Sequence, residues 1–134
     1  NTYADIKAES DAGCTSANAL KGIEAMPGNE VIFLPDIFMA QNLQKRTKKK
    51  LHYWSGKCIV HDTFTREQVL EYKRAYPGLK VLSHLACDQS VIGVSDIAGG
   101  TADMVGVGLG VSSLTGPSSQ KVGVNPPVAM DTEL

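Results

Sequence analysis

The sequence predicts an α/β fold made of three-layer αβα units with short parallel sheets. Short apolar runs typical of buried strands, at residues 31–36, 51–54 and 81–84, alternate with segments of helical spacing. This alternation is characteristic of βαβ units. Of the 134 residues, 43% are hydrophobic and 20% are charged, a composition that supports a packed core.

The first half of the chain predicts two helices and two strands. A helical stretch over residues 17–26 precedes the strand at residues 31–36. Asp36 lies at the end of that strand, where its carboxylate can cap a helix running through Gln44. The second strand, residues 51–54, follows that helix, as expected for a parallel crossover.

The second half repeats the same logic. Thr65 and Gln68 have the spacing of a capping box and predict the start of the clearest helix in the chain. A third strand is expected at residues 81–84, and a short one near Ile97 runs into a glycine turn. Thr101 then begins another helix.

Charge and cysteine content limit the classes of function. The net charge of −1 gives no electrostatic reason to expect nucleic acid or an anionic membrane as a partner, and no apolar run is long enough for a membrane span. The three cysteines, Cys14, Cys58 and Cys87, are odd in number and widely spaced, which suits a reducing compartment such as the cytoplasm. The first residues have neither an initiator Met nor signal-peptide features, so we expect a processed or excised chain.

Two predicted helix starts carry hydroxyl residues, Ser16 and Thr101. A hydroxyl beside unpaired backbone N–H groups at a helix N-terminus forms a small anion site, although each residue could equally be an ordinary cap. Both starts would follow strands of a parallel sheet, where α/β proteins bind ligands. This placement favours a binding role for the pair.

Cysteine and histidine also form two short pairs, Cys58-x-x-His61 and His84-x-x-Cys87. Together they could complete a tetrahedral zinc site. The alternative is that the cysteines are small hydrophobic core residues and the histidines are structural.

A longer series of motifs resembles the quinolinate synthase family, and the likeness covers about residues 1–104. The motifs occur in the family's order. They are the opening residues 1–11, Thr-Ser-Ala-Asn at 15–18, Phe-Leu-Pro-Asp at 33–36, Trp-Ser-Gly-Lys-Cys-Ile-Val-His at 54–61, Phe-Thr at 64–65, Tyr-Pro at 76–77, His-Leu-Ala-Cys at 84–87, Asp96 and Gly-Thr at 100–101.

The resemblance implies a fold of three αβα domains around a pseudo-threefold axis. In the complete enzyme each domain gives one cysteine to a [4Fe–4S] cluster, whose open iron acts as a Lewis acid. The reaction implied is the condensation of iminoaspartate with dihydroxyacetone phosphate to quinolinate, in NAD biosynthesis. An L-aspartate oxidase would be the supplier of iminoaspartate.

The resemblance also assigns individual residues. Cys58 takes the metal-ligand position of the middle domain, and Asn1 and Ser16 take substrate-binding positions there. His84, the predicted catalytic residue, and Thr101 match positions of the third domain. The family pattern His-Pro-Glu-Cys departs here, because Ala86 stands in place of the acid–base glutamate. Loss of a general acid or base costs about 10²–10⁴ in rate.

We therefore expect three regions. Residues 1–58 form the middle domain without its first strand, residues 59–108 form part of the third domain, and residues 109–134 form an irregular tail. With one cluster cysteine of three, this chain alone should retain no cluster and no activity, and exposed domain interfaces should favour self-association. The alternatives are a non-catalytic module that binds a dicarboxylate or phosphate, and a zinc protein.

Overall fold

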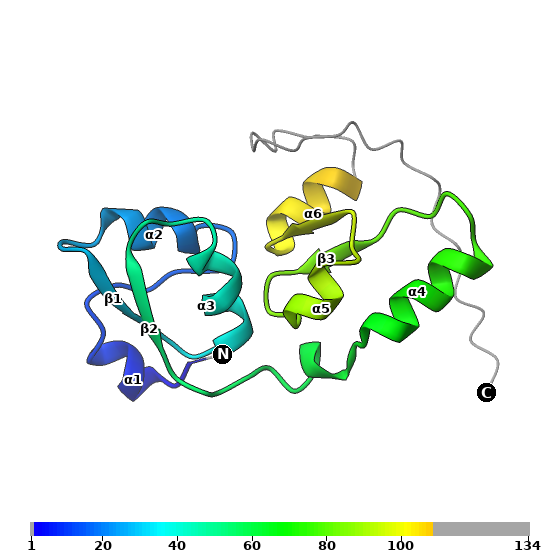
Figure 1. The fold of residues 1–134 in the computed structure, drawn as a ribbon. Helices are drawn as coiled ribbons and strands as arrows, with labels where there is room; N and C mark the ends of the chain where they lie inside the picture. Colours follow the sequence, from blue (N-terminus) through cyan, green and yellow to red (C-terminus); the bar gives the residue numbers. More distant parts are fainter. Residues whose placement is uncertain (1, 109–134) are drawn as a thin grey trace.

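The computed structural model describes residues 2–108 and contains two β–α units packed side by side (Figure 1). Each unit has one sheet of two parallel strands, so the predicted α/β fold with short parallel sheets is confirmed. The strands are β1 (Glu30–Phe33), β2 (Lys50–Tyr53), β3 (Leu82–His84) and β4 (Ile97–Gly99). The helices are α1 (Ala4–Ala8), α2 (Ala19–Ala25), α3 (Ile37–Gln44), α4 (Arg66–Ala75), α5 (Gln89–Ile92) and α6 (Thr101–Gly108), with a 3₁₀ turn at His61–Thr63.

In the first unit, α3 connects β1 to β2 and makes their parallel pairing possible. β1 ends two residues before Pro35, which has no amide hydrogen for a strand ladder. Asp36 caps α3 as predicted, because its carboxylate accepts a 2.7 Å hydrogen bond from the amide of Met39. The start of α2 differs from the prediction. The Asn18 side chain accepts from the amide of Thr15 at 2.7 Å, so the helix begins at residue 19 and not at 17.

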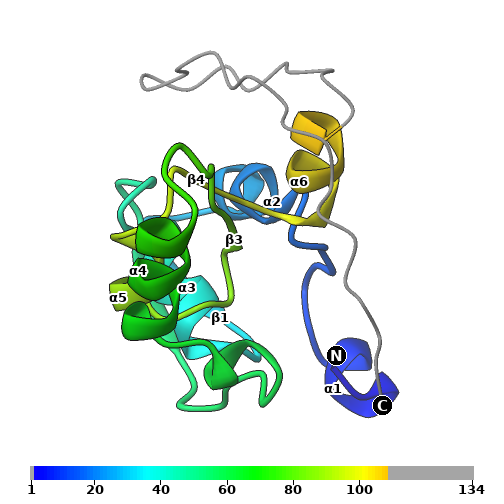
Figure 2. The same ribbon diagram turned by 90° about the vertical axis from the view of Figure 1, so that its right-hand side faces the viewer.

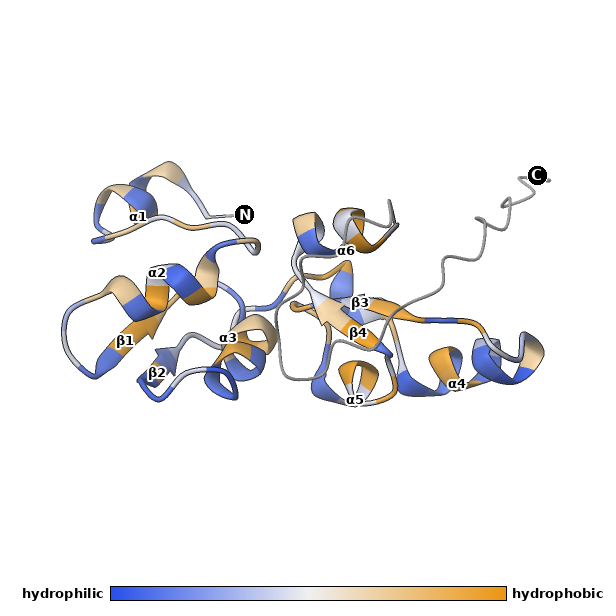
Figure 3. Ribbon diagram, turned by 90° about the horizontal axis from the view of Figure 1, so that it is seen from above, coloured by the Kyte–Doolittle hydropathy of each residue, from blue (hydrophilic) through white to orange (hydrophobic). Residues whose placement is uncertain are grey.

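The second unit begins with α4, which starts at the predicted capping box of Thr65 and Gln68. α4 buries no residue, and Tyr72 on it is 61% exposed. In Figure 3, coloured by hydropathy, this helix is mostly hydrophilic, whereas β1 and β4 are largely apolar. Asp96 ties α4 to the strands, since its carboxylate lies 2.9 Å from the Lys73 Nζ on α4 and accepts from the Val81 amide before β3.

One hydrophobic core serves both units. Most of it comes from the first unit, and Leu85 and Ala86 enter it from the loop after β3. Its buried members are Ala19, Ile23, Phe33, Met39, Ala40, Leu43, Leu51, Leu85 and Ala86. Because residues from both units share this core, packing between the units contributes to stability of the whole.

Helix α3 also bonds to the second unit through polar side chains. Asn42, 5% exposed, donates from Nδ2 to the carbonyl oxygens of Leu85 at 2.8 Å and Cys87 at 3.1 Å. Further along, Arg46 donates to the Ala98 carbonyl at 3.1 Å. The view in Figure 2 also shows α1 standing apart from α3 and its neighbours.

The limits of the predicted regions, residues 1–58 and 59–108, stay predictions, and the predicted tail of residues 109–134 lies outside the described residues. Within residues 2–108, the structure has no helix that is both long and apolar enough to cross a bilayer.

Candidate functional site

The two hydroxyl residues predicted at helix starts meet in the structure. Ser16 Oγ, ahead of α2, accepts a hydrogen bond from the Thr101 amide at the start of α6, at 3.4 Å. The approach depends on Gly100, because a Cβ there would lie 2.7 Å from the Ser16 carbonyl carbon and oxygen. The ends of α2 and α6 therefore converge, although they belong to different units.

The N-terminal end of α6 already has a carboxylate beside it. The carboxylate of Asp103 accepts from the Gly100 amide at 2.8 Å, so one N–H group at this end is already used. The Thr101 amide is likewise bonded, to Ser16 Oγ, so an anionic ligand would face the hydroxyl groups of Ser16 and Thr101 rather than an open helix end. The other predicted substrate residue of the first unit, Asn1, lies outside the described residues.

Cys58 lies in an irregular segment after β2 and is half-buried, with a free thiol. Its backbone amide donates a 2.9 Å hydrogen bond to Oδ2 of Asp36, the residue that caps α3. The segment is joined to α3 a second time, where the Ile37 amide donates to the Gly56 carbonyl at 2.8 Å. These bonds place Cys58 at the N-terminal end of α3.

The two histidines of the Cys/His pairs are in contact. The rings of His61 and His84 stack with centroids 4.5 Å apart and planes 15° from parallel. Nδ1 of His84 accepts a hydrogen bond from the Ala86 amide at 3.1 Å, which puts the proton of the neutral ring on Nε2. Burial lowers the pKa of His84, and the charge of His61 lowers it further, against an opposing effect of Asp36. A neutral His84 with Nε2–H as a donor is the result.

Cys87 is a core residue, 4% exposed. Burial raises the pKa of its thiol, with smaller contributions in the same direction from Asp36 and Cys58. Across residues 2–108, no group of three or more His, Cys, Asp and Glu side chains is placed to hold a metal ion. Of the four residues considered for a zinc site, the two histidines stack on each other. The four do not form a ligand set in the described part of the chain.

The same observation bears on an iron–sulfur cluster. Cys58 fits the position of a single thiolate ligand, because it is free, accessible and held at its amide. The described residues do not complete a donor set around Cys58.

Ala86 is buried in the shared core, 4% exposed. Its side chain is a methyl group, which neither donates nor accepts a proton. Its backbone amide acts instead, by fixing the ring of His84. No general acid–base side chain therefore occupies position 86.

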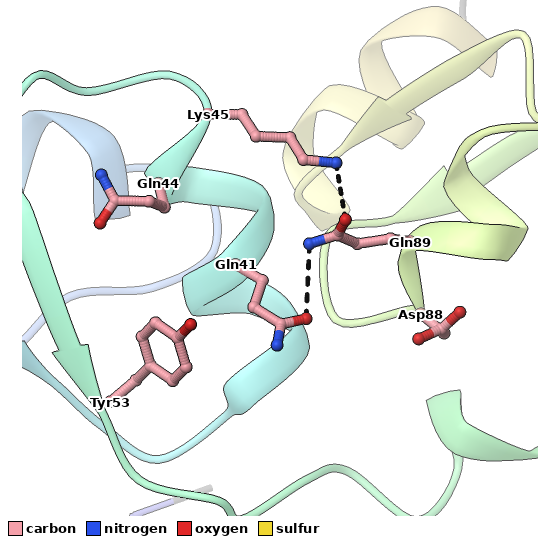
Figure 4. Close-up of a pocket in the computed structure, with 6 residues that line it drawn as sticks. All are labelled: Gln41, Gln44, Lys45, Tyr53, Asp88 and Gln89. Atoms are coloured by element: carbon pink, nitrogen blue, oxygen red, sulfur yellow. Dashed lines mark hydrogen bonds between the residues drawn. The ribbon is translucent and has the colours of Figure 1, made fainter.

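A separate, solvent-open pocket of about 460 Å³ lies between α3 and α5 (Figure 4). Three of its polar side chains are already bonded to one another. Gln89 accepts from Lys45 Nζ at 2.8 Å and donates to Gln41 at 3.4 Å, so these side chains join the two units. The remaining lining residues are Gln44, Tyr53 and Asp88. None of the residues predicted from the sequence lines this pocket, and we regard it as part of the junction between units.

Sequence reasoning identified Asp36 only as a helix cap and did not single out Asn42. The bond from Cys58 to Asp36 joins residues 22 positions apart, and the bonds of Asn42 span 43 and 45 positions. Local patterns carry no signal for such contacts. The only available hint was an acidic residue directly after a predicted strand, ahead of the Cys58 motif.

Comparison with known proteins agrees with the motif series. Residues 1–110 match the sequence model of the family described as quinolinate synthetase A protein. The chain is 42% identical over 105 residues to a quinolinate synthase of Sinorhizobium medicae and 43% identical over 104 residues to quinolinate synthase 1 of Mesorhizobium japonicum. A quinolinate synthase of Caulobacter vibrioides is 41% identical over 108 residues. Each match covers 78% of this chain but only 29%, 32% and 29% of those proteins, so the chain spans about a third of their length.

Proposed function

The chain belongs to the quinolinate synthetase A family, and we propose that it carries part of the site at which a quinolinate synthase condenses iminoaspartate with dihydroxyacetone phosphate. The observation that carries this proposal is the family match across residues 1–110, which includes every predicted site residue. We further propose an L-aspartate oxidase as supplier of iminoaspartate. The cytoplasm is the proposed location, since the three free cysteines suit a reducing compartment.

The residues of this chain have distinct proposed roles. The hydroxyl groups of Ser16 and Thr101, which the bond between the two residues holds close together, would bind a carboxylate or phosphate of the substrates. His84, neutral with its proton on Nε2, would donate a hydrogen bond to a substrate oxygen. Cys58 would be one thiolate ligand of a [4Fe–4S] cluster, which when bound supplies Lewis-acid polarisation of the substrate.

Ala86 limits what this set of residues can do. The family's glutamate at this position moves protons, and a buried methyl group cannot replace it. We therefore propose that this segment, placed in a complete enzyme, would support a rate lower by about 10²–10⁴ than that of a relative that has the glutamate.

A chimera tests this proposal. Residues 1–104 of this chain would replace the matching segment of the Sinorhizobium medicae relative, with Ala86 or with Ala86→Glu. After anaerobic addition of iron and sulfide, quinolinate formed from iminoaspartate and dihydroxyacetone phosphate is measured by chromatography. We expect little product with Ala86 and recovery of at least about 10² in rate with Ala86→Glu.

The unmodified relative is the positive control, and the relative with its matching glutamate replaced by alanine separates the effect of residue 86 from that of the graft. A folded, iron-loaded Ala86→Glu chimera that forms no quinolinate would refute the assignment of this segment to the enzyme. Equal activity of the two chimeras would refute the role given to residue 86.

A non-catalytic binding module is the second candidate, favoured by the contact between Ser16 and Thr101 together with Ala86. Calorimetry of the 134-residue chain with aspartate, phosphoglycolate and quinolinate tests it. Heat of binding that disappears in Ser16→Ala supports the module, and no binding of all three ligands contradicts it.

A further inference from the structure

The carboxylate of Asp36 accepts two hydrogen bonds, which come from two different segments of the chain. Oδ1 accepts from the Met39 amide at 2.7 Å and caps α3, while Oδ2 accepts from the Cys58 amide at 2.9 Å. The residue is 8% exposed; its bond to Met39 is buried and its bond to Cys58 is partly buried. A buried carboxylate bonded to backbone amides forms charge-assisted hydrogen bonds, which are stronger than neutral ones.

Close backbone packing surrounds the second bond. The Gly56 carbonyl accepts from the Ile37 amide at 2.8 Å, one residue after Asp36. A Cβ on Gly56 would lie 2.8 Å from the Pro35 carbonyl oxygen, a backbone atom that cannot turn aside. The segment before Cys58 is therefore pressed against the start of α3 as well as bonded to it.

A helix cap alone does not account for an aspartate at this position. Serine or asparagine caps a helix about equally well, and each offers only one acceptor oxygen. The structure uses both oxygens of Asp36, and the second one is directed to Cys58, 22 residues away. The choice of a carboxylate is explained by the two bonds together.

We propose that Asp36 is a positioning residue for Cys58, which holds the backbone of the cysteine at the N-terminal end of α3 and so fixes where its thiol is presented. The value of this placement for metal binding rests on the proposed function, whereas the placement itself does not. A ligand held in advance loses less conformational entropy when the metal binds. The negative charge of Asp36 also acts to raise the pKa values of His84 and Cys87 in the second unit.

Amide hydrogen exchange of the metal-free 134-residue chain, followed residue by residue by NMR, tests this proposal. The Cys58 amide should exchange at least about tenfold more slowly than those of Ile59 and Val60, for which the described residues offer no acceptor. Exchange of Cys58 as fast as that of its neighbours overturns the proposal, and this measurement needs no variant.

The decisive variant is Asp36→Ser, because serine still caps α3 but its single short hydroxyl cannot also reach Cys58. We expect exchange at Cys58 to become about 10–100-fold faster, while that of Met39 changes little. Asp88→Ser is the matched control, since Asp88 caps α5 through the Ser90 amide and bonds to nothing near Cys58. Unchanged exchange at Cys58 in Asp36→Ser overturns the proposal.

A second readout follows the thiol itself. Alkylation of Cys58 by iodoacetamide, measured by mass spectrometry against Cys14 in the same molecule, should become faster in Asp36→Ser and not in Asp88→Ser. If Asp36→Ser does not fold, Gly56→Ala displaces the segment from the other side and should have the same effect on Cys58. Equal alkylation in the parent chain and the folded variant contradicts the proposal. All these results are independent of quinolinate formation by the chimera.

Discussion

Replacing Asn42 by alanine should weaken the junction between the two units and lower the stability of the chain. The Asn42 side chain donates to two carbonyl oxygens of the loop after β3, at Leu85 and Cys87, which are 3% and 4% exposed. Alanine would leave both carbonyls buried without these donors. Each such loss costs about 1–3 kcal/mol, and partial relaxation brings the expected total to about 2–4 kcal/mol.

Thermal unfolding followed by circular dichroism measures this loss. At about 4 °C per kcal/mol for a domain of this size, the midpoint should fall by about 8–16 °C. Gln41→Ala is the control, since Gln41 is on the same helix and makes only a 3.4 Å bond to Gln89, so its effect should stay within about 0.5 kcal/mol. The reasoning is refuted if Asn42→Ala shifts the midpoint no more than Gln41→Ala does.

Two further predictions concern stability. The pKa of Asp96 is lowered to about 2, first by the Val81 amide and then by Lys73, so its contribution is present above about pH 4 and is lost as the pH falls through about 2. Because Asp96 is partly solvated, its contribution to stability at pH 7 is about 1 kcal/mol. Urea unfolding should show Asp96→Asn less stable by that amount at pH 7, with the gap shrinking toward pH 2; a gap that widens in acid contradicts this. Gly100→Ala should destabilise the chain by about 1–3 kcal/mol, because its Cβ would meet the Ser16 carbonyl at 2.7 Å. Gly13→Ala, with open space around it, should unfold within about 0.5 kcal/mol of the parent, and equal midpoints for the two variants would contradict the packing argument.

The elements that the sequence predicted well are those that depend on neighbouring residues. The capping box of Thr65 and Gln68 is present as expected, and each predicted strand lies within a few residues of the observed one. Capping and apolar runs are short-range features, because the groups that interact lie within four residues of each other. The helix after Ser16 shows the limit of this approach, since the bond between Asn18 and Thr15 delays its start.

The candidate site was predictable in its members and not in its arrangement. The contact of Ser16 with Thr101 joins residues 85 positions apart, and the stack of His61 on His84 joins the 3₁₀ turn before α4 to the end of β3. The sequence left open whether Cys58, His61, His84 and Cys87 form a zinc site or are structural residues. In the structure Cys87 is buried and the two histidine rings are stacked, an arrangement that local spacing did not predict.

Helix α3 explains how three separate segments of the site are held in register. At its start, Asp36 bonds to the Cys58 amide, and in its middle, Asn42 bonds to the carbonyls on both sides of Ala86. Just beyond its end, Arg46 bonds to the Ala98 carbonyl, three residues before Thr101.

These three anchors bond to backbone atoms of the segments that carry Cys58, His84 and Thr101. A hydrogen bond to a backbone atom does not depend on the neighbouring side chain. Substitutions at the site can therefore change its chemistry while the segments stay bonded to α3. Ala86 is the natural example, because its carbonyl neighbours keep their bonds to Asn42 while its side chain carries no acid–base group. A frame of this kind would therefore persist whichever side chain stands at position 86. For that reason, Ala86→Glu in the chimera should raise the rate of quinolinate formation without any change in α3.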